Sequence, residues 1–157
     1  MSVLLVRVDD RLIHGQVVIG WGRAVNCERI VLIDDGIAHN NWEQELYRMG
    51  VPENMTVEFA SVSEAASAYP AWTANGQRTI VLLTDVDTLV RFCSVAPVTK
   101  VNLGGIHGGE DRTERLSYVF LSQWELEQLR DLSARGIEIT AQDVPTARAI
   151  ALQDLAR

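Results

Sequence analysis

The chain has 157 residues, of which 47% are hydrophobic and 22% are charged, and its formal net charge is −7. This length and balance predict one globular domain over residues 1–157, with a substantial core, and argue against a disordered chain. The acidic net charge, with no run of basic residues, argues against nucleic acid or an anionic membrane surface as a partner.

Branched apolar residues at the start of the chain predict a buried strand over residues 3–8, which stops at an acidic pair, Asp9 and Asp10. Because charged residues interrupt it, this apolar start is too short for a secretion signal or a membrane span, and we expect a cytoplasmic protein. Apolar residues then recur at helical spacing over residues 15–25 and predict a helix there.

Strand-like apolar runs alternate with helical patterns along the rest of the chain. Strands are predicted at residues 29–33, 56–60, 79–84, 99–103, 116–121 and 137–141, and helices at 40–49, from 61, at 85–93, at 123–134 and from Pro145. This alternation predicts an α/β fold in three layers, α/β/α, around a mostly parallel central sheet. In such sheets ligands lie beyond the carboxyl ends of the strands, so the active loop is expected at that edge.

The loop after the first strand, DDRLIHGQ over residues 9–16, gathers the charged residues of this region. His14 lies at the start of the predicted helix, where backbone N–H groups and the helix dipole favour an anion such as phosphate. Arg11 supplies a fork of donors to the same anion, Gly15 leaves room for an incoming group, and Gln16 adds neutral donors. A neutral imidazole is suited to accept a phosphoryl group here, because phosphoryl transfer requires mainly positioning and charge stabilisation.

The residues alone leave two interpretations of this loop open. In the first, His14 is a nucleophile with Asp9 or Asp10 beside it, and the sequence does not say which carboxylate is near. In the second, the charged residues form a solvated loop and His14 only caps a helix. Cys27 and Cys93 fit neither a zinc site nor a disulfide framework, and no metal or other cofactor is expected.

The segment RVDDRLIHGQV over residues 7–17 closely resembles the signature of the IIB component of the mannose/fructose/sorbose family of the sugar phosphotransferase system. Three further stretches agree with this family in order and spacing: VNLGGI at 101–106, LSARGIE at 132–138 and VPT at 144–146. The resemblance implies that a histidine accepts a phosphoryl group from a phosphorylated IIA partner. It also implies that this group passes to a sugar, which enters through IIC and IID membrane components.

Carried onto this sequence, the resemblance makes His14 the phosphorylated nucleophile and Arg11 the residue that steadies the phosphoryl group. Gln16 and the backbone of Gly15 are expected to line the pocket. Asp10 is expected to order the loop through Arg11. The protein is thus predicted to be a phosphotransferase of the phosphohistidine–sugar type.

The glycine-rich loop over residues 104–109 holds the main departure from the family pattern. Many relatives carry an aromatic and a basic residue after the first glycine pair, where this chain has two more glycines. This departure motivates an alternative function, a phosphorylation-dependent regulatory module of a sugar phosphotransferase system. Gly105, His107 and Thr84 are expected to border the phosphoryl site, although His107 also fits an exposed loop histidine. No phosphate-loop lysine follows these glycines, which argues against a nucleotide site.

Overall fold

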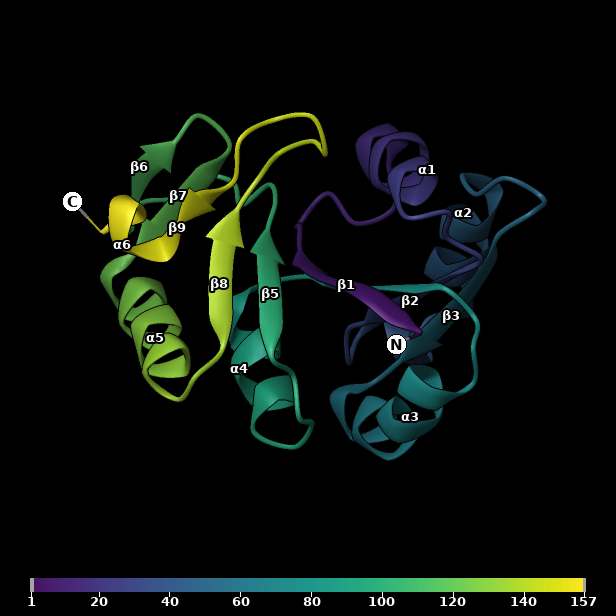
Figure 1. Ribbon diagram of the computed structural model, residues 1–157. Helices are drawn as coiled ribbons and strands as arrows, with labels where there is room; N and C mark the ends of the chain where they lie inside the picture. Colours follow the sequence, from purple (N-terminus) through teal and green to yellow (C-terminus); the bar gives the residue numbers. More distant parts are fainter. Residues whose placement is uncertain (1, 157) are drawn as a thin grey trace.

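A seven-stranded sheet forms the centre of the molecule, in the strand order β3-β2-β4-β1-β5-β8-β9 (Figure 1). The structure is a computed structural model and describes residues 2–156. The strands of the sheet are β1 (Val3–Val8), β2 (Arg29–Ile33), β3 (Thr56–Ala60), β4 (Thr79–Leu83), β5 (Lys100–Leu103), β8 (Glu138–Ala141) and β9 (Ile150–Ala151). Every neighbouring pair is parallel except β8 and β9, so the predicted α/β fold with a mostly parallel sheet is confirmed.

Helices pack on both faces of the sheet. They are η1 (Gln16–Trp21), α1 (Gly22–Ala24), η2 (Ile37–His39), α2 (Asn41–Met49), α3 (Val62–Ala74), α4 (Val86–Cys93), α5 (Gln123–Ala134) and α6 (Leu152–Leu155). β2 and β4 are buried along their whole length, which is why they carry apolar residues on both faces. Val31 and Val81 belong to the core that packs against α3, α4 and α5, whereas Ile30 and Ile80 belong to the core beneath η1.

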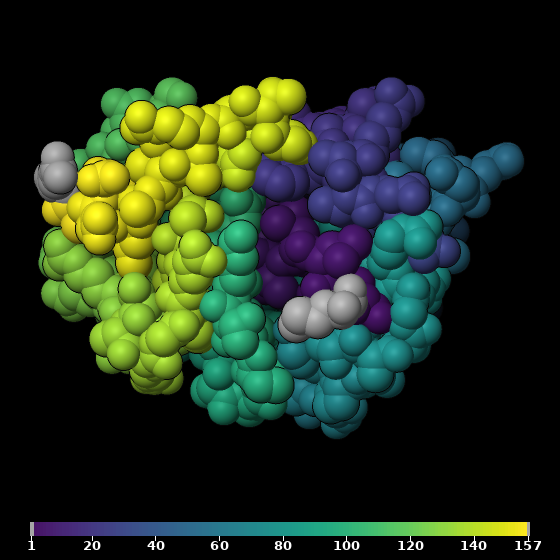
Figure 2. All heavy atoms as spheres, in the orientation of Figure 1, coloured from purple at the N-terminus to yellow at the C-terminus, as the bar shows by residue number. Residues whose placement is uncertain are grey.

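Within the described residues, the part of the sheet that contains β5 and β8 has helices on one face only (Figure 1). Val101 and Ile139 belong to the core with α4 and α5, whereas Lys100 and Thr140 line the open face. β1 pairs with β5 only over the last two residues of each strand, so the first part of β1 diverges from β5. A cleft of about 440 Å³ opens there, and Figure 2 shows it as the hollow beside the purple residues of β1.

The segment after β1 is helical as predicted, but the helix type differs. Six residues form the π-helix η1, and the short α-helix α1 continues it. Two turns of apolar spacing fit either type of helix, so the sequence pattern could not separate them. Such π segments are rare and occur frequently at functional sites.

The single strand predicted at residues 116–121 is wrong. Two strands, β6 (Arg112–Leu116) and β7 (Val119–Ser122), form an antiparallel hairpin that turns inside this range. Most residues of β6 are polar or charged, and a solvated strand of this kind escapes a search for apolar runs.

The helix predicted from Pro145 is also wrong. Residues 142–149 form a loop, in which Gln142 Nε2 donates to the carbonyl oxygens of Pro145 and Ala147. A glutamine that binds these carbonyl oxygens stabilises a turn in place of a helix. The chain then pairs β9 against β8 and ends in α6.

The direction of the connections changes between β1 and β5. The connection after β1 leads to β2 on one side of the sheet, and the connection after β5 leads to β8 on the other. The loops after these two strands therefore meet at the carboxyl edge, where doubly wound sheets bind ligands. Across residues 2–156, no helix is long and apolar enough to cross a membrane.

Candidate functional site

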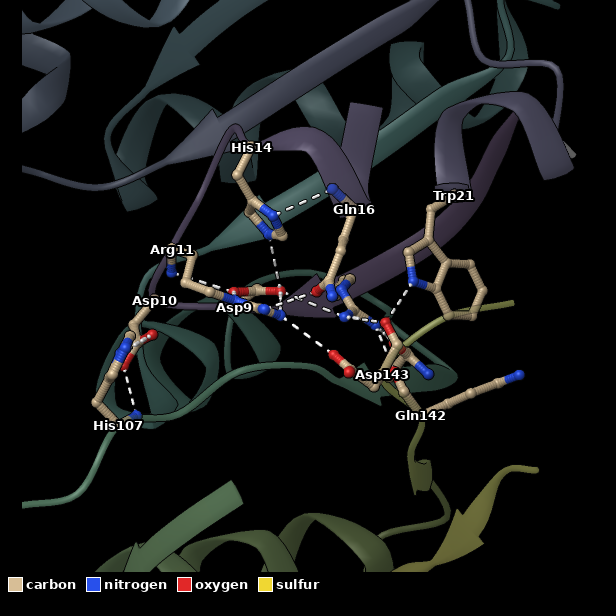
Figure 3. A network of polar contacts seen from close by, with 11 residues as sticks. Asp9, Asp10, Arg11, His14, Gln16, Trp21, His107, Gln142 and Asp143 are labelled. Atoms are coloured by element: carbon tan, nitrogen blue, oxygen red, sulfur yellow. Dashed lines mark hydrogen bonds and ion pairs between the residues drawn. The ribbon is translucent and has the colours of Figure 1, made fainter. Parts of the chain in front are cut away.

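Asp9 is the centre of a network of polar contacts at the carboxyl end of β1 (Figure 3). Its side chain is fully buried between two arginines that flank it in the sequence. Arg7 donates from Nη2 to Asp9 Oδ2 at 3.2 Å. Arg11 donates from Nε to Oδ1 at 3.0 Å and from Nη2 to Oδ2 at 2.9 Å. Because the backbone N–H of Arg11 also donates to Oδ1, the loop folds around this carboxylate.

Asp9 is ionised at neutral pH despite its burial. Burial by itself would raise the pKa of Asp9, since a desolvated carboxyl group favours its neutral form. Hydrogen bonds from His14 and Arg11, together with the charges of Arg7 and Arg11, outweigh burial and hold the pKa of Asp9 well below its usual value. His14 therefore has an ionised carboxylate beside it throughout the physiological pH range.

His14 precedes η1 and places its ring beside Asp9, with its side chain 20% exposed (Figure 3). Nε2 lies 3.3 Å from Asp9 Oδ2, and the backbone N–H of Gln16 donates to Nδ1 at 3.3 Å. Because Nδ1 accepts a hydrogen bond, it must carry the lone pair of the neutral ring. The proton of the neutral ring is therefore assigned to Nε2, which faces the carboxylate of Asp9. The ring thus offers Nδ1 as its nucleophilic atom while a carboxylate holds the other nitrogen.

Arg11 lies beside His14 at the partly exposed edge of the network. Nη1 donates to Gln16 Oε1 at 2.6 Å, and Nη2 donates to Asp143 Oδ1, in the loop after β8, at 3.3 Å. The hydrogen bond to Asp9 is the main cause that raises the pKa of Arg11, so the guanidinium stays charged. Gly105 lies directly against it, because a Cβ at this position would be 2.6 Å from Arg11 Nε. The structure thus brings three of the predicted residues, Arg11, Gln16 and Gly105, into one cluster.

Sequence reasoning missed Arg7, which ties the network to the rest of the sheet. Burial lowers the pKa of this guanidinium, which is wholly inaccessible to solvent. It donates to Asn102 Oδ1 and to the carbonyl oxygens of Gln142 and Asp143. The guanidinium also lies 5.0 Å from the ring centre of Trp21. A signal was present in the sequence, because an arginine inside an apolar strand needs buried acceptors.

Asp10 faces a different partner from the one expected. It accepts a hydrogen bond from the backbone N–H of His107 at 2.7 Å, and its other oxygen lies 2.6 Å from His107 Nδ1. Arg11 is bound by Asp9, so Asp10 orders the glycine-rich loop and not the arginine. His107 is 71% exposed at the rim of the site. Arg112 holds this residue from the other side, with Nη1 donating to its carbonyl oxygen.

Two further predicted residues lie outside these contacts. Thr84 Oγ1 donates to Asp34 Oδ2 at 2.9 Å and lies 3.3 Å from Thr88 Oγ1, so its hydroxyl joins the ends of β2 and β4 to α4. A Cβ at Gly15 would meet open space, so packing does not require a glycine there. The open space leaves room for a group that approaches His14.

A pocket of about 240 Å³ lies between Arg11 and the hairpin, with His107, Tyr118 and Phe120 among its walls. Gly108 forms another wall, and a Cβ at this position would be 3.4 Å from the Phe120 ring. In the described part of the chain, no group of three or more His, Cys, Asp and Glu side chains could hold a metal ion.

The fold and the network define a doubly wound α/β protein whose switch point holds a histidine and an arginine on one buried carboxylate, an arrangement suited to phosphoryl transfer. The family model described as "PTS system sorbose subfamily IIB component" matches residues 3–157. The chain belongs to this family, as its resemblance predicted.

Individual relatives agree with this assignment. The chain is 31% identical to the "PTS system mannose-specific EIIAB component" of Escherichia coli (strain K12), over 99% of this chain and 48% of that protein. It is 26% identical to the "PTS system fructose-specific EIIB component" of Bacillus subtilis (strain 168), over 93% of this chain and 90% of that protein. The crystal structure of manxB from Thermoanaerobacter tengcongensis superposes with a TM-score of 0.90 at 28% identity, covering 98% of this chain and 94% of the other. The chain thus spans about half the length of the E. coli protein.

Proposed function

We propose that this protein is a phosphocarrier, which accepts a phosphoryl group on His14 from a phosphorylated IIA protein and passes it to a sugar during uptake through IIC and IID membrane components. The proposal includes a single IIB domain, a cytoplasmic location and the activity of a protein-Nπ-phosphohistidine–sugar phosphotransferase. One observation carries it: the two contacts of the His14 ring leave Nδ1 as the lone-pair atom. The sugar-specific names of the relatives support transport over a regulatory module.

Acceptance of the phosphoryl group is a displacement at phosphorus. The lone pair of His14 Nδ1 forms the new N–P bond while the N–P bond of the donor phosphohistidine breaks. His14 gains positive charge as this bond forms, and the carboxylate of Asp9 at Nε2 stabilises that charge. The backbone N–H of Gln16, which donates to Nδ1 before transfer, then donates to a phosphoryl oxygen.

Donation to the sugar is a second displacement at the same phosphorus. A sugar hydroxyl oxygen forms the O–P bond, the bond to Nδ1 breaks, and the hydroxyl proton leaves to solvent. His14 recovers its lone pair on Nδ1, so the site returns to its starting state and can be loaded again.

The other residues shape the site around this histidine. Arg11 neutralises phosphoryl oxygens, Gly15 leaves space for them, and Gly105 lets the guanidinium lie against the backbone. Asp10 and His107 fix the rim on which a partner docks. We expect Thr84 to border the site from the end of β4, with its hydroxyl held by Asp34 and Thr88.

Intact-mass analysis after incubation with a phosphorylated IIA protein tests the proposal. Wild type should gain one acid-labile phosphoryl group and His14→Ala none. His39→Ala, which removes an exposed histidine of η2, should gain one group and serves as the matched control. Phosphorylation of His14→Ala at the wild-type rate would overturn the proposal, and so would an unlabelled wild type beside another IIB protein that the same donor labels.

A further inference from the structure

Asp143 is held at the site by its backbone, not only by its side chain. Its carbonyl oxygen accepts hydrogen bonds from Arg7 Nη2 at 2.9 Å and from Trp21 Nε1 at 3.1 Å. The neighbouring carbonyl oxygen, of Gln142, accepts another bond from Arg7 Nη1 at 2.8 Å. Because these donors lie on β1 and η1, the loop after β8 is fixed to the elements that carry the His14 loop. The backbone of Asp143 is therefore held where its side chain reaches Arg11.

Four of the five N–H donors of the Arg11 guanidinium have an acceptor before any phosphoryl group arrives. Asp9 accepts from Nε and Nη2, Gln16 accepts from Nη1 at 2.6 Å, and Asp143 accepts from Nη2 at 3.3 Å. The contact with Asp143 is the longest of these, and the Asp143 side chain is 31% exposed whereas Asp9 is fully buried. A phosphoryl group on His14 that binds Nη2 of Arg11 therefore competes first with the carboxylate of Asp143.

The charges of the cluster balance before phosphorylation. Arg7 and Arg11 supply two positive charges, and Asp9 and Asp143 supply two negative ones. A phosphoryl group adds about −1.5 to −2 charges near neutral pH. The phosphorylated site is then strongly negative, and the fixed backbone of Asp143 keeps its carboxylate in the neighbourhood of that charge. An asparagine at this position would keep the hydrogen-bond acceptor and remove one negative charge.

We propose that Asp143 is a tuning residue, whose fixed carboxylate competes with the phosphoryl group for Arg11 and raises the tendency of phosphorylated His14 to give that group away. This inference rests on the proposed phosphocarrier function. Asp143 acts through Arg11 and takes no part in bond making, so it is a positioning residue rather than a catalytic one. Its removal should stabilise the phosphorylated form about fivefold at low ionic strength, the size expected for a partly solvent-screened repulsion between like charges.

The test compares the phosphorylated fraction at equilibrium with a phosphorylated IIA protein at fixed ratio. Asp143→Asn should shift the equilibrium about fivefold toward the phosphorylated form, and the shift should shrink as salt is added, because salt screens partly exposed charges. Asp143→Glu, which keeps the charge, should stay near wild type. Asp131→Asn is the matched control, because it removes the acid of another ion pair, in which Asp131 on α5 lies 2.6 Å from Arg135, the residue that follows this helix.

The outcomes separate the inference from the function on which it rests. An unlabelled wild type would overturn both. A labelled wild type with an unchanged or lower phosphorylated fraction in Asp143→Asn would overturn the tuning role alone. Equal shifts in the Asn and Glu variants, independent of salt, would show that Asp143 only supports the loop and would also overturn it. Urea unfolding of each variant confirms that the compared proteins are folded.

Discussion

Asp9 and Asp10 are adjacent in the sequence, yet they build two different regions of the molecule. Asp9 is buried, ion-paired to two arginines and in contact with His14. Asp10 is partly exposed and holds the glycine-rich loop through His107. A carboxylate in the buried region acts through a low dielectric and is screened little by salt, whereas one at the rim contributes mainly hydrogen bonds. The two side chains differ in where the end of β1 points them, not in chemistry.

The largest expected effect is that of Asp9→Ala. It leaves the Arg7 guanidinium buried without its carboxylate, which should lower the free energy of unfolding on the order of 3–5 kcal/mol and abolish phosphorylation. Urea unfolding and intact-mass analysis measure the two losses. Asp10→Ala, measured beside it, should lose far less stability. Equal losses in the two variants would contradict the distinction between the regions.

The stability that Asp9 contributes should also depend on pH. Because the pKa of Asp9 is lowered in the folded protein, its ionisation stabilises the fold above the unfolded-state pKa of about 4. This contribution is lost as the pH falls below that value. The stability difference between wild type and Asp9→Asn should therefore be constant near pH 7 and shrink steadily below pH ~4. A difference that does not change with pH would contradict the lowered pKa.

A methyl group added at Gly105, which faces Arg11, should have a larger effect than one added at Gly108, which faces Phe120. Gly105→Ala places a Cβ 2.6 Å from Arg11 Nε, so it should displace the guanidinium, cost about 1–3 kcal/mol and slow phosphorylation. Phosphorylation rate and urea unfolding check the two effects. A Gly105→Ala protein with wild-type kinetics would show that Arg11 tolerates displacement.

A smaller effect is expected at the rim. Asp10→Asn weakens the contacts with His107 and should cost about 1 kcal/mol. Amide hydrogen exchange should quicken in the loop at 104–109 while the amides of β1 keep their protection. Faster exchange throughout β1 would place Asp10 in the same cooperative unit as Asp9.

The smallest effect is expected for Gly108→Ala. Its Cβ would lie 3.4 Å from the Phe120 ring, an ordinary contact, so stability should change by less than about 0.5 kcal/mol. Thermal unfolding beside Gly105→Ala makes the comparison within one loop. A loss as large as that of Gly105→Ala would show that the outer side of the loop is as tightly packed as the inner side.

The strands β2 and β4 could be predicted because they are buried on both faces and read as continuous apolar runs. β2 and β3 have the predicted bounds, and so does the helix α5, which a Ser122–Glu125 capping box begins. The hairpin of β6 and β7 could not be predicted, because β6 is mainly polar. The loop after β8 was mistaken for a helix because a proline can begin a helix or a turn.

The site was predictable only as far as it is local in sequence. Arg11, His14 and Gln16 lie within six consecutive residues, so their types and spacing indicate an anion site. The choice between Asp9 and Asp10 depends on which way the end of β1 points, and no local pattern contains that information. The contacts of Arg11 with Gly105 and Asp143 require the finished sheet, because they join separate strands.

The hydrogen-bond partners of Arg7 set an order in which the site can form while the chain is synthesised. Its hydrogen bonds with Asn102, Gln142 and Asp143 join positions 95, 135 and 136 residues apart. Contacts of such separation form late, and an arginine placed in the sheet without them would be buried with unmet donors. A ribosome must therefore release the loop after β8 before the site near the other end of the chain can close. Fragments that end before this loop keep Asn102 but lack the carbonyl oxygens of Gln142 and Asp143, so they cannot complete the surroundings of Arg7.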